Sequence, residues 1–310
     1  MGLSIFTRGL ILIKTLLMRL FFLKPHPPVE ALIQYHPVHT ENMVFCLGVT
    51  NSDDFIDLSE RHHALEKNGT VLLSTAGLDI DGLNGVAAGG LTVPDLTLRA
   101  YQDYTLMAVI SAKNIMLDSA EHNVVFIGDY KTGNASTLVG VKSVASGDTR
   151  KLVFRVVYGA SNRSNPASAS NLISDVDVPA SLIVDNGDGT VNITTSLIVA
   201  SLSSSESDNA GSICFYLPSY QLEAMTDRAF AAADEKRVFT VEGKSLAQSS
   251  GLNPVTIGFV HDTFSSATHK TIKTARIDAV SLTAQQIEDQ YQATKSLLLA
   301  EGAVDISHWR

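Results

Sequence analysis

Short apolar stretches separated by turn-forming residues recur from residue 43 onward. In several of them apolar and polar residues alternate, as at 151–158, which is typical of a strand with one buried face. Twelve such stretches at this spacing predict an antiparallel sandwich or barrel. The sequence NGDG at 186–189 tolerates the positive φ of a tight turn and predicts a hairpin. The stretches are MVFCLGV, GTVLLST, YTLMAVIS, NVVFIGDY, TLVGVKSV, KLVFRVVYG, ASLIVD, TVNITTSLIVASL, SICFYLP, RVFTVEG, PVTIGFV and KTIKTARIDAV.

Two segments within this β-rich part have the character of helices. The clearer one is 282–300, where Thr283 and Gln286 have the spacing of a capping box and Gly302 follows the end. Apolar residues stand one turn apart inside it. Residues 220–235 are rich in alanine and predict a short helix in a connection between strands. We therefore expect a C-terminal helix on an otherwise all-β domain.

The first 24 residues contain the most apolar stretch of the chain, interrupted by basic side chains. At 100° per residue, small polar residues together with Arg8 and Arg19 fall on one side, which predicts an amphipathic helix over 1–24 with a wide apolar face. Its charges disfavour a membrane span, and its short apolar runs disfavour a secretory signal. Three interpretations stay open: a helix docked into another protein, a helix lying on a membrane, and a segment outside the native product if translation starts at Met18 or Met43.

Prolines define the next segment, residues 25–42, and predict an extended, semi-rigid connector. The predicted organisation is an amphipathic helix over 1–24, this connector, one β domain over 43–300 and a tail over 301–310. The wide apolar face of such a helix has to be buried against another surface. We therefore expect residues 3–23 to bind other protein subunits, with a homo-oligomer as one form and membrane contact as the alternative.

Charge and cysteine content narrow the classes of partner. The net charge is −9, and the four basic residues among the first 24 leave −13 on the remainder. Such an acidic body lacks the clustered Lys and Arg that bind phosphate, so we exclude nucleic acid as the main partner. Cys46 and Cys214 stand far apart in apolar strand-like stretches. They predict buried free thiols, since neither a disulfide framework nor a metal cluster has this spacing.

Few side chains suggest chemistry. His62 and His63 could be metal ligands, but no third ligand is placed by the sequence, and structural or surface histidines are favoured. Asp185 and Asp188 loosely resemble a calcium loop, but the alternate oxygen donors and the closing Glu of such a loop are missing, so a turn is favoured. We assign no catalytic, cofactor-binding or metal-binding residue and expect no cofactor.

Four segments in consistent order resemble concanavalin A-like, laminin-G-type jelly rolls. Residues 55–111 resemble the opening half, which begins with a D-L-S-G-N-G-H-type turn. RVFTVEGKSLAQSSG at 237–251 resembles a Y-V-D-G hairpin. NPVTIGFV at 253–260 is similar to a P-L-x-I-G strand, and ARIDAVSLTAQQIEDQY at 275–291 to the closing strand and helix. The family's W-H-H-V-A strand is absent, and the single tryptophan is Trp309. The resemblance implies an antiparallel jelly-roll β-sandwich.

Concanavalin-like folds include glycoside hydrolases, so an enzyme has to be considered. Laminarinase-type enzymes place their carboxylates in an E-x-D-x-x-E pattern on one strand, and IDAV at 277–280 lacks the flanking glutamates. Neither H-E-x-x-H nor G-x-S-x-G occurs. We expect a non-catalytic structural or adhesion module of a virion or a bacterial surface assembly, with a surface glycan as a further partner. A membrane-tethered glycan-binding lectin and a laminarinase-like glycosidase are the alternatives.

Overall fold

The computed structural model describes residues 37–49, 55–74, 76–80, 89–98, 102–129, 137–147, 149–158, 161–162, 165–169, 172–205, 210–218, 236–241, 253–259, 268–302 and 304–310. The chain divides into two compact units, 1–33 and 34–310. The helix predicted over 1–24 and the alanine-rich segment 220–235 lie outside the described residues. The account below concerns the second unit.

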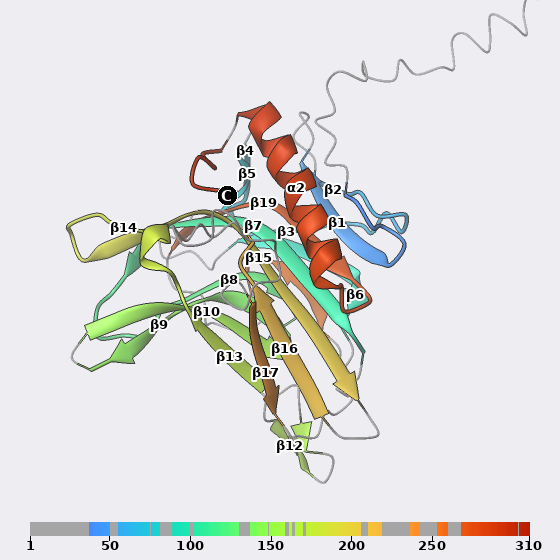
Figure 1. The fold of residues 1–310 in the computed structure, drawn as a ribbon, viewed down its shortest axis with the longest axis horizontal. Helices are drawn as coiled ribbons and strands as arrows, with labels where there is room; N and C mark the ends of the chain where they lie inside the picture. Colours follow the sequence, from blue (N-terminus) through green and yellow to red (C-terminus); the bar gives the residue numbers. More distant parts are fainter. Residues whose placement is uncertain are drawn as a thin grey trace, which may run out of the picture. The chain divides into compact units, whose positions relative to one another are not determined.

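Two large sheets and one small hairpin make up this unit (Figure 1). The strands of the first sheet are β1 (Met43–Val49), β2 (Phe55–Asp57), β4 (Leu72–Ser74), β5 (Gly77–Ile80), β7 (Tyr104–Met116), β14 (Ile183–Asp185), β15 (Thr190–Ser205), β16 (Ala210–Tyr216), β17 (Lys236–Val241) and β19 (His269–Asp278). Those of the second are β3 (Glu66–Asn68), β6 (Gly90–Thr97), β8 (Asn123–Gly128), β9 (Leu138–Ser146), β10 (Thr149–Tyr158), β13 (Leu172–Asp177) and β18 (Pro254–Ile257). The hairpin pairs β11 (Ser161–Asn162) with β12 (Asn165–Ala169), and a 3₁₀ turn, η2 (Ala180–Leu182), precedes β14.

Strand order confirms the predicted all-β antiparallel sandwich. The first sheet runs β17-β16-β15-β7-β19-β1-β2, with β14 on β15 and the β4–β5 pair on β19. The second runs β13-β10-β9-β8-β18-β6-β3. All pairings between these strands are antiparallel. The main apolar core lies between the two sheets, where Phe154 of β10 stacks on Phe215 of β16 with ring centroids 5.3 Å apart.

Helix α2 (Ala284–Glu301) lies against the outer side of the first sheet (Figure 1). It confirms the helix predicted over 282–300. The Thr283 hydroxyl accepts a hydrogen bond from the Gln286 amide, the Gln286 side chain accepts one from the Thr283 amide, and Gly302 ends the helix in the left-handed conformation at φ 62°. Apolar residues of α2 pack on β7, β15 and β16 in a second core. Among the described residues, the longest apolar helical segment falls short of what a membrane crossing requires.

Residues 304–310, beyond the predicted domain end, turn back over the same face of the sheet. Ile306 and Trp309 are buried there with the residues of α2. The Trp309 indole stacks on Tyr291 with centroids 5.5 Å apart, and its Nε1 donates a hydrogen bond of 2.9 Å to the carbonyl of Thr195 on β15. The tail therefore forms part of the cover of the first sheet.

A β-bulge in β19 changes which side chains face the core. Ile272 lies opposite Ile110 of β7, but the next pair is Thr274 with Val109, so Lys273 is an extra residue on β19. Side chains alternate between the faces of a strand, and one extra residue reverses that alternation. Before the bulge, even-numbered residues of β19 face the sandwich interior; after it, odd-numbered residues do.

Residues 37–42, which the sequence assigns to the connector, contact β19 and α2. The Nη1 atom of Arg276 donates a hydrogen bond of 2.7 Å to the Val38 carbonyl, and its Nη2 atom donates one of 2.6 Å to the His39 carbonyl. The Gln290 side-chain oxygen of α2 accepts a hydrogen bond of 3.0 Å from the Val38 amide. Main-chain groups of this segment therefore bind it to the β domain, and the His39 ring adds a side-chain contact of 2.8 Å with the Asp289 carboxylate of α2.

Candidate functional site

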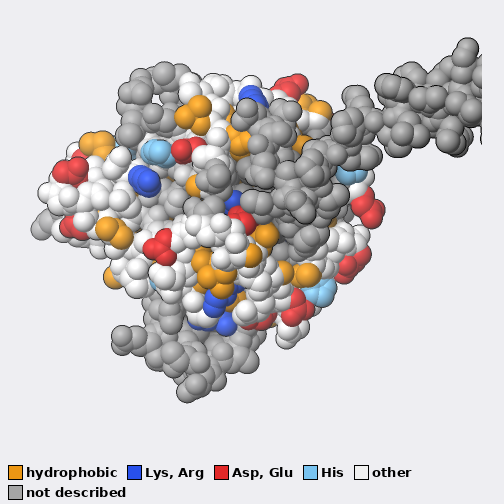
Figure 2. Space-filling view, turned by 90° about the horizontal axis from the view of Figure 1, so that it is seen from above, with side chains coloured by type: hydrophobic (Ala, Val, Ile, Leu, Met, Phe, Trp, Pro, Cys, Tyr) orange, Lys and Arg blue, Asp and Glu red, His pale blue; other side chains and the backbone are white. Residues whose placement is uncertain are grey.

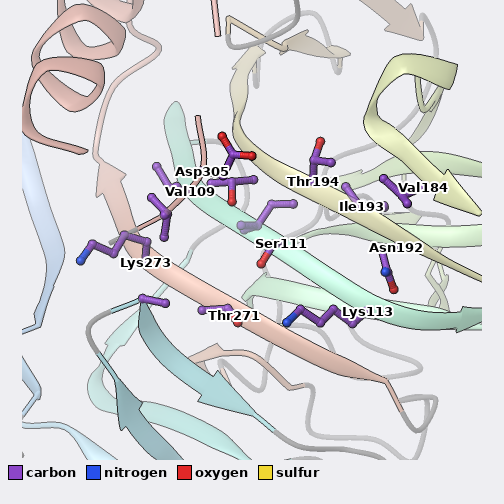
Figure 3. Close-up of a pocket in the computed structure, with 14 residues that line it drawn as sticks. Val109, Ser111, Lys113, Val184, Asn192, Ile193, Thr194, Thr271, Lys273 and Asp305 are labelled. Carbon is purple, nitrogen blue, oxygen red and sulfur yellow. The ribbon is translucent and has the colours of Figure 1, made fainter. Parts of the chain in front are cut away.

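A cavity of about 360 Å³ opens on the outer face of the first sheet (Figure 3). Its walls come from β7, β14, β15 and β19, from the turn between β4 and β5, and from the tail after α2. The lining residues are Ala76, Val109, Ile110, Ser111, Lys113, Val184, Asn192, Ile193, Thr194, Thr195, Thr271, Lys273, Val304 and Asp305. We call this cavity the outer pocket.

The alternation along β7 explains why polar side chains line the outer pocket. Met107 and Val109 point to the outer face and are buried under α2. The next two residues on that face, Ser111 and Lys113, lie in the outer pocket instead. The outer face of β7 thus changes from apolar to polar where the cover ends. Sequence motifs single out none of the pocket residues, but this change within one alternating strand is a signal that could have found them.

The bulge of β19 places a buried ion pair beside the outer pocket. Lys273 lies 2.7 Å from the Glu301 carboxylate at the end of α2, and the two side chains are only 11% and 5% exposed. Figure 3 shows the Lys273 ammonium pointing away from the other labelled residues. The positive charge of Lys273 is therefore balanced by α2.

Two charged groups remain in the lining. Lys113 is exposed and makes no hydrogen bond or ion pair with a residue that the structure describes. Asp305 accepts a hydrogen bond of 2.9 Å from the Ser307 amide, and the hydrogen bonds from Ser307 lower the pKa of its carboxyl group. The carboxylate is thus ionised at neutral pH. In Figure 3 the Lys113 ammonium and the Asp305 carboxylate lie on opposite sides of the lining, with Ser111 between them.

Hydroxyl groups and a fixed amide complete the polar lining. The Asn192 amide exchanges two hydrogen bonds with the Asn186 amide, of 3.1 and 2.8 Å, so the hairpin sets its orientation. Val109, Val184 and Val304 provide apolar surface between these groups. Hydrogen-bonding groups around an apolar floor suit a small hydroxylated ligand. Asp305 is the one carboxylate among the lining residues, whereas glycoside hydrolysis needs two flanking the scissile bond.

The histidines noted in the sequence lie in a different place, in the turn after β2. Asp57 organises this turn: its carboxylate accepts hydrogen bonds of 2.9 Å from the amides of Cys46, Ser59 and His63. The His63 ring is only 7% exposed and lies 2.9 Å from the Asp95 carboxylate. His62 adopts a positive φ of 48°. These contacts fit the structural role favoured for both histidines.

The aspartates noted in the sequence belong to the β14–β15 hairpin. Asp185 accepts a hydrogen bond of 2.8 Å from the Gly187 amide, and Asp188 accepts one of 3.0 Å from the Thr190 amide. Gly187 and Gly189 have φ of 76° and 84°, as the predicted turn requires. The hairpin is therefore confirmed, and both carboxylates serve its turn. The described part of the chain contains no group of three or more metal-ligating side chains.

Both cysteines are free thiols in separate strands of the first sheet. Cys46 on β1 is fully buried, and burial raises the pKa of its thiol far above the ordinary value. Cys214 on β16 donates a hydrogen bond of 3.3 Å to the Tyr216 hydroxyl. Because β15, β7 and β19 lie between their strands, the two thiols cannot meet.

Comparison with solved structures identifies the same architecture in other proteins. The chain is similar to the binding domain of botulinum neurotoxin DC in complex with SialylT, with a TM-score of 0.54 and 12% identity over 83% of this chain and 52% of that one. A structure of botulinum neurotoxin type C, whose cell entry is dependent upon interaction with two ganglioside molecules, has a TM-score of 0.52 and 14% identity over 83% of this chain and 52% of that one. The binding domain of neurotoxin DC with rat synaptotagmin II has a TM-score of 0.53 and 12% identity over 83% and 52%.

The likeness therefore concerns the fold and spans about half the length of those chains. No protein-family model and no curated protein sequence matches this chain.

Proposed function

We propose that this protein is a non-catalytic structural or adhesion module of a virion or a bacterial surface assembly, and that it binds a carbohydrate in the outer pocket. The observation that carries the proposal is the lining: hydroxyl, amide, ammonium and carboxylate groups surround apolar patches on a rigid sheet, with a single carboxylate. Some structural neighbours are described with a sialylated ligand or gangliosides, which supports a glycan as the first ligand class to test.

The face seen in Figure 2 shows no continuous basic patch among the residues that the structure describes. On the face in Figure 2, Lys and Arg side chains stand singly or in small groups among Asp and Glu side chains. This distribution differs from the continuous basic surface of a nucleic-acid-binding protein. It supports recognition through a defined pocket over recognition through a charged surface.

A glycan array with the full chain tests the proposal. We expect binding to at least one carbohydrate class and loss of that binding in Ser111→Trp, because an indole at this position fills the outer pocket. Ser111 forms no side-chain hydrogen bond with a described residue, so the fold should persist. The matched control is Ser146→Trp, at an exposed position on β9 of the other sheet, which should bind as the wild type does. Binding that survives Ser111→Trp would place the carbohydrate elsewhere.

The alternatives from the sequence have separate tests. Hydrolysis of laminarin or another β-glucan by the full chain would overturn the non-catalytic assignment and favour a glycosidase. Detection of the protein in purified particles by mass spectrometry would support the assembly role. Recovery in a membrane fraction, released only by detergent, would favour a membrane-tethered lectin.

We also propose that residues 3–23 form the assembly contact. An amphipathic helix with a wide apolar face exposes more apolar surface than an isolated soluble helix tolerates. A second copy of this chain or another subunit of the assembly would cover it. The chain without residues 1–36 should then be monomeric by light scattering and absent from particles, whereas unchanged assembly would show that this segment is dispensable.

A further inference from the structure

We propose that the outer pocket is selective for an acidic sugar, whose anionic group binds Lys113 and whose hydroxyl groups bind Asp305. This inference rests on the proposed carbohydrate-binding function and adds the chemical class of the ligand. It follows from the distribution of charge in the pocket.

Lys113 is the one lining cation that remains available to a ligand. The other, Lys273, is balanced by Glu301 within the protein. On a neighbouring strand, the Asp79 carboxylate of β5 contacts the His269 ring and accepts a hydrogen bond of 3.5 Å from the Thr271 hydroxyl. His269 lies opposite Lys113 in the register of β19 and β7, so Asp79 is occupied on the side from which it could have approached Lys113.

The Ser111 hydroxyl beside Lys113 completes an anion site. Ser111 precedes Lys113 by two residues on the same face of β7, and Thr271 lies opposite Ser111 on β19. Figure 3 shows the Lys113 side chain extending along the sheet toward Thr271. An ammonium group beside the Ser111 hydroxyl donor matches a carboxylate or sulfate group, because hydrogen bonds to an ionised group are about twice as strong as those between neutral groups.

The opposite side of the pocket sets the orientation of the ligand. Asp305 is ionised at neutral pH and therefore repels an anion and accepts hydrogen bonds from hydroxyl groups. Val184 and Val304 supply apolar surface for the C–H face of a sugar ring. A sugar with one acidic substituent and free hydroxyl groups on the far side satisfies all three features at once.

Because the protein has a net charge of −9, selectivity for an acidic sugar has to come from groups inside the outer pocket. A basic protein attracts every anionic glycan, whereas this protein as a whole repels them. Charges more than about 10 Å away are largely screened at moderate ionic strength, so the groups within the pocket decide the preference.

The experiment compares acidic glycans with their neutral parents on the full chain. An array carrying sialylated, uronated and sulfated glycans beside the unmodified parents identifies the best pair, and calorimetry then gives both affinities; 3′-sialyllactose with lactose and cellobiuronic acid with cellobiose are the soluble pairs. We expect the acidic member to bind about tenfold tighter or more, since a hydrogen bond to a charged group is stronger than one to a neutral group. Lys113→Met should reduce this ratio to near one, and Lys113→Arg should retain most of it.

Two further variants separate the groups. Asp305→Asn should weaken both members of a pair by a similar factor, because it alters the hydroxyl contact and not the anion contact. Lys151→Met removes an exposed lysine of β10, in the other sheet, and should change neither affinity. An equal loss for both members in Lys113→Met would overturn the assignment of Lys113.

The failure of this inference differs from that of the proposed function. If the wild type binds neutral and acidic glycans equally and Lys113→Met leaves both unchanged, acidic selectivity is wrong while carbohydrate binding stands. If the wild type binds no glycan, the proposed function fails and this inference with it.

Discussion

Two cations are buried on the same strand, β19, in opposite situations. Arg276 is 1% exposed and Lys270 is 1% exposed. Arg276 donates to both oxygens of Asp278, to the carbonyls of Val38 and His39, and to Gln290, which uses all five of its N–H groups. The Lys270 ammonium has no hydrogen-bond partner among the described residues.

The bulge between them explains the difference. Lys270 lies before it, opposite Ile80 and Ala112, and therefore faces the apolar interior between the sheets. Arg276 lies after it and faces α2 and residues 37–42, where acceptors are present. Burial alone shifts the pKa of Lys270 down to about 7. The side chain therefore stays buried and gives up its proton as the pH rises above about 7. The comparison teaches that the acceptors available on each face, and not the depth of burial, decide whether a buried cationic side chain finds hydrogen-bond partners among the described residues.

The largest expected effect follows from removing the paired cation. Arg276→Met should lower the free energy of unfolding by about 3–5 kcal/mol, because Asp278 is left buried without its counter-charge. Urea denaturation measures this loss. Arg155→Met, which breaks a partly exposed pair with Asp175 on the other sheet, is the matched control and should have a much smaller effect. A loss as small as that of the control would mean that the cluster contributes little.

Replacing Lys270 should change the free energy of unfolding in the opposite direction to Arg276→Met. Lys270→Met should raise the free energy of unfolding at pH 7 by about 2–4 kcal/mol, since the desolvation cost of the amine disappears. The pKa of Lys270 is about 7 in the folded protein and about 10.4 when unfolded, so the unfolded chain binds more protons between these values. Wild-type stability should therefore rise with pH from about 7 to about 10. Urea denaturation of Lys270→Met across this window should lack that rise, and a wild-type curve that is flat there would contradict the assignment.

Asp129, directly after β8, tests whether burial also favours the neutral form of an acidic side chain. Burial raises its pKa to about 7, against the hydrogen bond of 2.6 Å that its carboxylate accepts from the Thr137 amide. The folded state holds the extra proton between about pH 4 and 7, so this contribution to stability falls as pH rises through that window. Asp129→Asn keeps an acceptor and should stabilise the protein by about 1–3 kcal/mol above pH 7. Thermal unfolding at pH 5 and pH 8 measures the effect, which should be clearly smaller at pH 5, where the folded state still holds the proton.

The smallest effect concerns the acceptors supplied by residues 37–42. Deletion of residues 1–36 should leave the free energy of unfolding of the β domain unchanged, because the carbonyls that bind Arg276 remain. Deletion of 1–42 removes two of those acceptors and should cost about 1–3 kcal/mol. Denaturation of the two shortened chains side by side decides the matter, and equal stability would show that water replaces the lost carbonyls without cost.

Much of this fold can be predicted from local sequence patterns. The capping box at Thr283 and the glycines of the hairpin at 186–189 act over a few residues, and the structure confirms both. Strand β6 is missing from the twelve predicted stretches because it contains Pro94. The structure tolerates that proline because β3 pairs only as far as Thr92 and the pairing with β18 is irregular between Val93 and Thr97.

The candidate site depends on relations that no local pattern contains. The outer pocket exists because α2 covers Met107 and Val109 but not Ser111 and Lys113. The alternation of β7 indicates which of its side chains lie on the outer face. Which of them are buried depends on the position of α2, which follows more than 170 residues later in the chain. The bulge of β19 likewise cannot be located from its own sequence, since it is defined by the register against β7.

The contacts of Arg276 have a consequence for the order of synthesis. The bonded groups of Val38 and Arg276 are separated by 238 positions, and β1 pairs with β19 over a similar interval. At about 5–20 residues per second, a ribosome needs roughly 10–50 s to bridge that interval. Until then β1 has an open edge where β19 will lie, which is a template for pairing with other chains. Slower initiation or a chaperone that shields this edge should therefore raise the yield of soluble protein.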